Sequence, residues 1–290
     1  MTRSRSPRFT RIVVGFDSAD EPQPLLQSVT VLARATRARV VGLFVEETNM
    51  MALADLPIVR FVQAGGGSST TLNADRMRSA LARQAAACEA ALSRVAEQAR
   101  LEWSFSRSRG SLREQITEQA EQGDLLVVRA DPYNDQAALQ ALDLARQACH
   151  RASGVMVIPR LARAIRGPVA LVTAGDANPL AAVALAAQVA QERREPLTVV
   201  LAAPNADMLK SIEDELRQFE FRGRVMVQRL VSPRVSQVAA LLREIGPSLI
   251  TANLHGGLFD DDQVALAMIK AAAAPVILLG NDGSDEARQG

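Results

Sequence analysis

The chain has 290 residues, of which 48% are hydrophobic and 3% aromatic, and its formal net charge at pH 7 is +1. This length is typical of about two domains, with cores built from Ala, Leu, Val and Ile. The near-neutral charge gives no electrostatic support for a nucleic-acid partner, and the longest Ala-rich stretch, 180–190, is too short to span a bilayer.

The first part of the chain alternates predicted strands and helices. A strand that ends before Asp17 is followed by acidic and Ser residues and then Pro22, which is helix-start chemistry. Strands are expected at 11–16, 39–45, 101–110, 124–130 and 155–159, and helices at 22–37, 73–100, 111–122 and 135–152.

An insertion at residues 46–71 interrupts this rhythm. It carries apolar residues between 50 and 62 and a run of three glycines at 65–67. No Lys follows these glycines and no apolar strand leads directly into them, so we expect a flexible connection and not a phosphate loop. The apolar residues are a lid over the strand ends, an interaction surface or a cap on the core.

The second part repeats the first without the insertion. The strand at 11–16 and its Asp17 are echoed at 169–173 and Asp176. Strands are expected at 169–173, 197–202, 224–230, 248–253 and 276–279, and helices at 179–194, 206–221, 234–245 and 260–274. The repeat predicts an α/β fold of two tandem, doubly wound parallel sheets. We place the domains at 1–163, with the insertion, and at 164–290.

Two cysteines, Cys88 and Cys149, lie in predicted helices without metal-ligand spacing, which favours a reducing compartment and a core role. The basic segment 2–8 is not followed by the apolar run of a secretory signal. We therefore expect a soluble cytoplasmic protein. Three acidic residues at 260–262 are interpreted as helix capping, with a hard-cation site as the alternative.

The order of these elements resembles the universal stress protein family. The resemblance rests on an apolar strand ending in Asp17, a Pro-initiated helix, a second strand ending in Phe44-Val45-Glu46, and a fourth strand at 124–128. It covers essentially the whole chain as a tandem pair. It implies a Rossmann-like, adenine nucleotide alpha hydrolase-like fold with five-stranded sheets of order 3-2-1-4-5, joined along their fifth strands. In one branch of the family it also implies an ATP site.

That branch has a glycine-rich loop after the fourth strand, and the first copy departs from it. Ala130 and Tyr133 stand where the two leading glycines belong, and no Gly-Ser pair follows. Asp131 and Asp135 would repel phosphate. In the ATP-binding branch, this loop presents free backbone N–H groups at a helix start, and these bind the phosphates.

The second copy keeps only one of these glycines, in the sequence His255-Gly256-Gly257, and is acidic at 260–262. These residues follow a parallel strand, where such sheets bind ligands. They form either a tight turn or a site for an anion or effector.

The candidate binding residues are therefore Asp17, Val45, Ala130, His255 and Gly256. The resemblance implies that Asp17 and Val45 lie on the adenine side of the site, although Asp17 is also interpreted as a helix-entry cap. We expect no catalytic residue and no metal ligand. No cofactor is assigned, and an adenine nucleotide is the one class left open.

Three functions remain open. The leading hypothesis is a non-catalytic stress-response protein that binds a protein partner or a small effector. The second is an adenine-nucleotide binder that uses Asp17 and Val45 without the glycine loop. The third, an enzyme of the related nucleotide-transferring group, would need a Ser-Gly-Gly loop after the first strand, where the chain has Gly15-Phe16-Asp17-Ser18. The two copies should form an intramolecular pseudo-dimer, and further association into a homodimer stays open.

Overall fold

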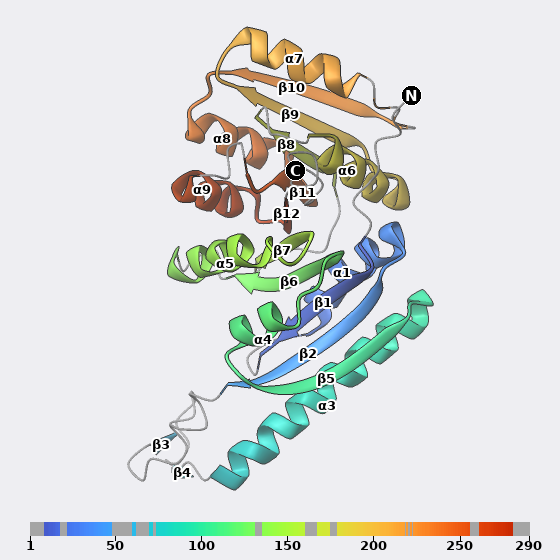
Figure 1. Cartoon of the computed structure of the whole chain (residues 1–290), viewed down its shortest axis with the longest axis vertical. Helices are drawn as coiled ribbons and strands as arrows, with labels where there is room; N and C mark the ends of the chain where they lie inside the picture. Colours follow the sequence, from blue (N-terminus) through green and yellow to red (C-terminus); the bar gives the residue numbers. More distant parts are fainter. Residues whose placement is uncertain are drawn as a thin grey trace, which may run out of the picture.

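A single ten-stranded sheet runs the length of the molecule (Figure 1). The computed structural model describes residues 9–17, 22–47, 60–61, 70–71, 74–130, 135–159, 167–174, 179–217, 219, 221, 223–255 and 261–280. The strand order is β10-β9-β8-β11-β12-β7-β6-β1-β2-β5. The strands of the N-terminal half are β1 (Arg11–Phe16), β2 (Arg39–Glu47), β5 (Trp103–Gly110), β6 (Asp124–Ala130) and β7 (Gly154–Pro159). Those of the C-terminal half are β8 (Val169–Thr173), β9 (Leu197–Ala203), β10 (Val225–Val231), β11 (Leu249–Asn253) and β12 (Val276–Leu279).

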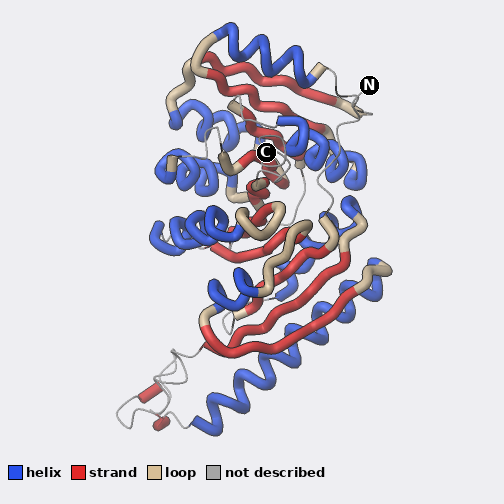
Figure 2. The backbone as a smooth tube through the Cα atoms, viewed as in Figure 1, coloured by secondary structure: helices blue, strands red, loops and turns tan. Residues whose placement is uncertain are grey.

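Helices cover both faces of the sheet (Figure 2). One face carries α1 (Pro22–Thr36), α3 (Ala74–Ala99), α6 (Pro179–Arg193) and α7 (Ala206–Leu216). The other carries α4 (Leu112–Glu118), α5 (Asp135–Ala148), α8 (Val235–Ile245) and α9 (Asp262–Ala272). Each layer has its own apolar core, as expected for a doubly wound sheet whose strands are buried on both sides.

The two halves join along their fifth strands. β7 and β12 pair antiparallel, with Val157 opposite Val276 and Gly154 opposite Leu279, whereas the other paired strands of this sheet are parallel. A Cβ atom on Gly154 would lie 2.9 Å from the carbonyl oxygen of Leu278, so a glycine is needed at this crossing. The predicted order 3-2-1-4-5 and the predicted junction are confirmed. The prediction of two sheets is corrected to one continuous sheet, because hydrogen bonding passes directly between these two strands.

Helices from the two halves also touch on both sides of the junction. On one face α1 packs against α6, where the Gln188 side chain donates to the carbonyl of Ala35 at 2.6 Å and Arg34 pairs with Glu192 at 3.0 Å. On the other face α5 packs against α9. The junction is therefore a three-layer contact and not a strand pair alone.

A buried ion pair ties β1 to β6. The carboxylate of Asp124 is fully buried and accepts from Arg11 Nε at 2.7 Å and from the amide of Glu121 at 2.8 Å. The hydrogen bond to Asp124 raises the pKa of the Arg11 guanidinium. At the start of β11 in the other half, the neutral Ser248 hydroxyl instead accepts from Arg193 at 2.7 Å.

Several predicted boundaries are corrected. β2 continues to Glu47, two residues into the predicted insertion. α4 ends at Glu118 and not at 122, because the Asp124 carboxylate binds the amide of Glu121. α7 ends at Leu216 and not at 221, because Phe219 and Phe221 pack against the core. The insertion contains a two-strand ribbon, β3 (Arg60–Phe61) and β4 (Thr70–Thr71), that the sequence did not predict.

Other predictions fall outside the described residues. These are the glycine run at 65–67, most of the apolar residues of the insertion, Asp176, Gly256, and the loop at 131–134 that replaces the phosphate cradle. The domain division at 163/164 also lies in an undescribed segment, so it stays a prediction.

Candidate functional site

Three of the predicted binding residues form one row at the carboxyl edge of the N-terminal half-sheet. Phe16 pairs with Phe44, so Asp17, the next residue, lies beside Val45. On the other side of β1 the pairing ends with Val14 opposite Val127, and Ala130 is the last residue of β6. Neighbouring strands are about 4.8 Å apart. The row therefore crosses β2, β1 and β6 at the topological switch point, where doubly wound sheets bind ligands.

Two side chains of this row, those of Val45 and Ala130, are buried beneath α4 and α5. Val45 is 0% exposed and Ala130 is 2% exposed, and both belong to the core beneath α4 and α5. Beside them, a Cβ atom on Gly15 would lie only 2.8 Å from Leu112 Cδ1, so α4 rests directly on β1. In this conformation neither Val45 nor Ala130 offers side-chain surface to an adenine ring.

The free backbone amides at the start of α4 already have hydrogen-bond acceptors within the protein. The Leu112 amide donates to the Glu47 carboxylate at 3.2 Å, and the Glu114 amide donates to the Ser111 hydroxyl at 3.4 Å. Glu46 at the same edge pairs with Arg109 at 3.0 Å. Two carboxylates therefore lie where the strand ends, which makes this edge unfavourable for a phosphate group.

Arg129 directly precedes Ala130 in β6. It was not among the binding residues predicted from the sequence. Leu125 and Val127 belong to the core on the α1 side, whereas Val128 and Ala130 belong to the core on the α4 side. Since side chains alternate along a strand, the half-buried Arg129 points to the α1 side, away from the row. A single Arg directly after the apolar run Leu125–Val128 was the available signal.

The second predicted site lies at the opposite edge of the sheet. Because β7 and β12 are antiparallel, the carboxyl ends of the two half-sheets face opposite ways. The half-buried His255 follows β11 and the buried Leu254, whose amide donates to the carbonyl of Leu279 at 2.9 Å. His255 therefore cannot join Asp17, Val45 and Ala130 in one site.

Comparison with solved structures identifies the architecture. A universal stress protein from Archaeoglobus fulgidus matches with a TM-score of 0.63 at 12% identity, covering 94% of this chain and 97% of that one. The chain has the tandem universal stress protein fold. A putative universal stress protein from Pseudomonas aeruginosa matches with a TM-score of 0.59 at 12% identity, covering 94% of each chain. A functionally unknown Pseudomonas aeruginosa protein matches with a TM-score of 0.56 at 13% identity, covering 93% and 92%. No family model and no curated protein matches the sequence.

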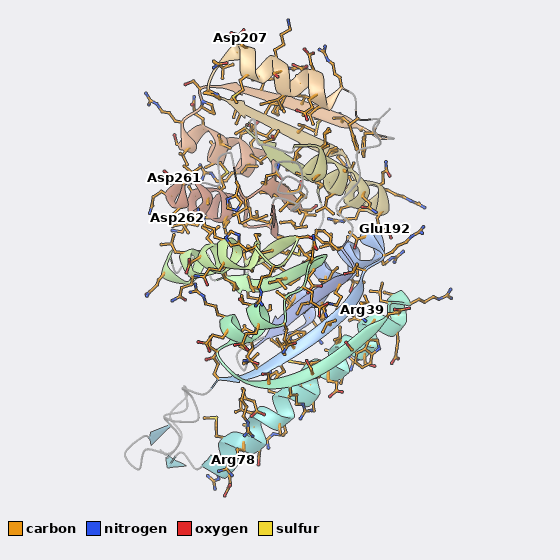
Figure 3. The ribbon with its side chains drawn as sticks, in the orientation of Figure 1. Arg39, Arg78, Glu192, Asp207, Asp261 and Asp262 are labelled. Atoms are coloured by element: carbon orange, nitrogen blue, oxygen red, sulfur yellow. The ribbon has the colours of Figure 1, made fainter. Side chains whose placement is uncertain are left out.

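Within this universal stress protein fold, the acidic run before α9 has structural roles. The Asp261 carboxylate caps α9 by accepting from the amides of Gln263 and Val264 at 2.8 and 3.2 Å, which confirms the capping interpretation for that residue. Asp262 pairs with Arg146 of α5 across the junction. Figure 3 shows Asp261 and Asp262 next to each other at the left of the molecule. The described residues contain no group of three or more side chains suited to a metal ion.

The two cysteines are buried in this fold and form no disulfide with each other. Burial raises the pKa of the Cys149 thiol to about 12, so this group is a neutral thiol at physiological pH and a poor nucleophile. No helix in the described part of the chain is long and apolar enough to cross a membrane.

Proposed function

We propose that this chain is a non-catalytic binding or regulatory protein of the stress response whose carboxyl edge does not hold the triphosphate of ATP. The observation that carries the proposal is the closure of the row by α4. Val45 and Ala130 are buried, and the first amides of α4 already bind Glu47 and Ser111. The loss of the glycine positions at Ala130 and Tyr133 points the same way.

In this proposal the chain works through a protein partner or a small effector, and not through bond-making chemistry. Three carboxylates, those of Asp17, Glu46 and Glu47, lie at or just beyond the ends of β1 and β2. The reduced, buried cysteines agree with a cytoplasmic location, which we retain as part of the proposal.

A second candidate is an adenine-nucleotide binder, and the alignment of Asp17 with Val45 favours it. Such a protein would hold AMP better than ATP, because the adenine side of the row is kept while the phosphate side is acidic. Binding would require α4 to move away from β1, since Leu112 lies over Gly15.

Isothermal titration of the full chain with ATP-Mg²⁺ and with AMP tests the proposal. We expect no low-micromolar ATP binding and no ATP hydrolysis. AMP binding that is lost in Asp17→Asn, but kept in the matched surface variant Asp214→Asn, would support the second candidate. Low-micromolar affinity for ATP would overturn the leading proposal.

A further inference from the structure

An arginine-rich hollow lies at the amino edge of the N-terminal half-sheet, on the side away from the Asp17 row. It encloses about 440 Å³ where the C-terminal ends of α1 and α3 meet the start of β2, with α6 of the other half beside them. Its charged lining consists of Arg34, Arg37, Arg39, Arg100, Glu102 and Glu192. None of these residues belongs to the candidate site at the carboxyl edge.

The hollow carries an excess of positive charge. Its lining has four arginines and two glutamates, which is an excess of two positive charges. Arg34 is paired with Glu192 at 3.0 Å. In the part of the chain that the structure describes, Arg37, Arg39 and Arg100 form no ion pair.

Two of these arginines occupy positions where glycine is the common residue. Arg37 follows α1 with φ 58°, and Arg100 follows α3 with φ 54°. The end of α3 is already closed by backbone bonds from the Arg100 amide to the carbonyl of Glu97 and from the Leu101 amide to the carbonyl of Ala96. The helix dipole favours a cation near each helix end. It does not explain why three guanidinium groups surround one hollow.

Small side chains keep the hollow open. Ala33 is 0% exposed and Ala38 is 3% exposed, and both line its floor, where larger residues would fill the space. Figure 3 shows Arg39 and Glu192 on the same side of the molecule, each from a different half of the chain. The hollow is therefore completed by the junction between the halves.

We propose that this hollow binds a small molecule that carries a diphosphate group. A guanidinium presents a planar fork of N–H donors that matches a pair of phosphate oxygens. Three such groups suit the several oxygens of a diphosphate better than a single phosphate. Glu102 and Glu192 belong to the same lining, so the arginines favour a compact anion over an extended nucleic-acid strand. The site is independent of the proposed function of the carboxyl edge.

Calorimetric titration of the full chain with inorganic diphosphate at low salt tests the inference, with orthophosphate and sulfate as comparisons. We expect one diphosphate per chain, bound more tightly than orthophosphate. The double variant Arg37→Gln/Arg100→Gln should bind roughly tenfold more weakly or worse, because charge-assisted hydrogen bonds are lost. Arg100→Lys keeps the charge but loses the planar fork, and should give an intermediate loss.

The matched control is Arg94→Gln/Arg243→Gln, which removes the same charge from two exposed positions elsewhere. It should bind diphosphate as the unmodified chain does, and all variants should keep the same thermal unfolding midpoint within a few degrees. The inference is overturned if the unmodified chain shows no saturable diphosphate binding, or if the control loses as much affinity. It is also overturned if Asp17→Asn abolishes the binding, since the ligand would then lie at the other edge.

Discussion

The two halves of the sheet share one strand order but have different outer edges. In the N-terminal half, edge strand β5 carries Arg107 and Arg109, both in ion pairs, and the 26-residue helix α3 packs against it. In the C-terminal half, edge strand β10 packs against the 11-residue helix α7 and has one ion-paired arginine, Arg229, but it exposes Val225, Val227 and Val231 by 42%, 39% and 54%. Charged side chains deter edge-to-edge pairing. The copies have therefore diverged at their rims.

At the inner junction the halves remain alike. Both fifth strands are apolar and buried, and each contributes side chains to the cores on both faces of the sheet. This contrast indicates that the junction carries the stability of the tandem fold, while the rims tolerate change.

Placing a charge in the junction should have the largest effect. Val157→Lys buries an ammonium group between β6 and β12, and we expect it to destabilise the fold by more than about 4 kcal/mol and to promote aggregation. Ile277→Lys should behave in the same way. Val231→Lys at the exposed rim is the matched control and should change stability by less than about 0.5 kcal/mol. Chemical denaturation measures both, and equal losses in the two variants would remove the contrast.

Breaking the ion pair between β1 and β6 should cause the second-largest loss of stability. Asp124→Ala leaves the largely buried Arg11 without its main partner and should cost roughly 3–5 kcal/mol. Asp143→Ala removes the partner of Arg113 in an exposed pair and should cost about 0–1 kcal/mol. The C-terminal half uses Ser248 at its own strand start, so Ser248→Ala should cost less than Asp124→Ala. Urea midpoints that rank these variants otherwise would contradict this assignment.

The smallest effect concerns Cys149, which lies where α5 meets the end of β12 beside Gly280. Its folded pKa is raised from 9.0 to about 12, so the neutral buried thiol stabilises the fold below about pH 9. This stability is lost as the pH rises from 9 towards 12, because the unfolded thiol ionises first. At pH 10 the loss should be about 1.4 kcal/mol. Cys149→Ala should unfold with a shallower pH dependence in this range, and an unchanged slope would show that the thiol is not buried.

The sequence was sufficient for the architecture because the architecture rests on local patterns. Apolar runs of strand length alternate with helical periodicity twice along the chain, and each run became the expected strand. The junction could also be predicted, since an unpaired apolar fifth strand in each copy needs a partner. The two halves form one sheet because β7 of the first half pairs with β12 of the second.

The site was harder to predict because it depends on contacts between distant residues. Arg11 and Asp124 are 113 positions apart, and only the strand register brings them together. The burial of Val45 under α4 depends on Glu47 accepting from Leu112, 65 positions away. The arginines of the amino-edge hollow come from two helix ends and a strand start, so no single stretch of sequence displays them. The alignment of Asp17, Val45 and Ala130 was predictable, whereas its closure was not.

Native mass spectrometry of the full chain incubated with ATP-Mg²⁺ counts the nucleotides bound per chain and so shows whether the carboxyl edge holds ATP. We expect no ATP at that edge. Any weak adduct through the arginine hollow should disappear in Arg37→Gln/Arg100→Gln and persist in Asp17→Asn. A stoichiometric ATP adduct that persists in the arginine double variant and is lost in Asp17→Asn would show that the carboxyl edge binds ATP after all.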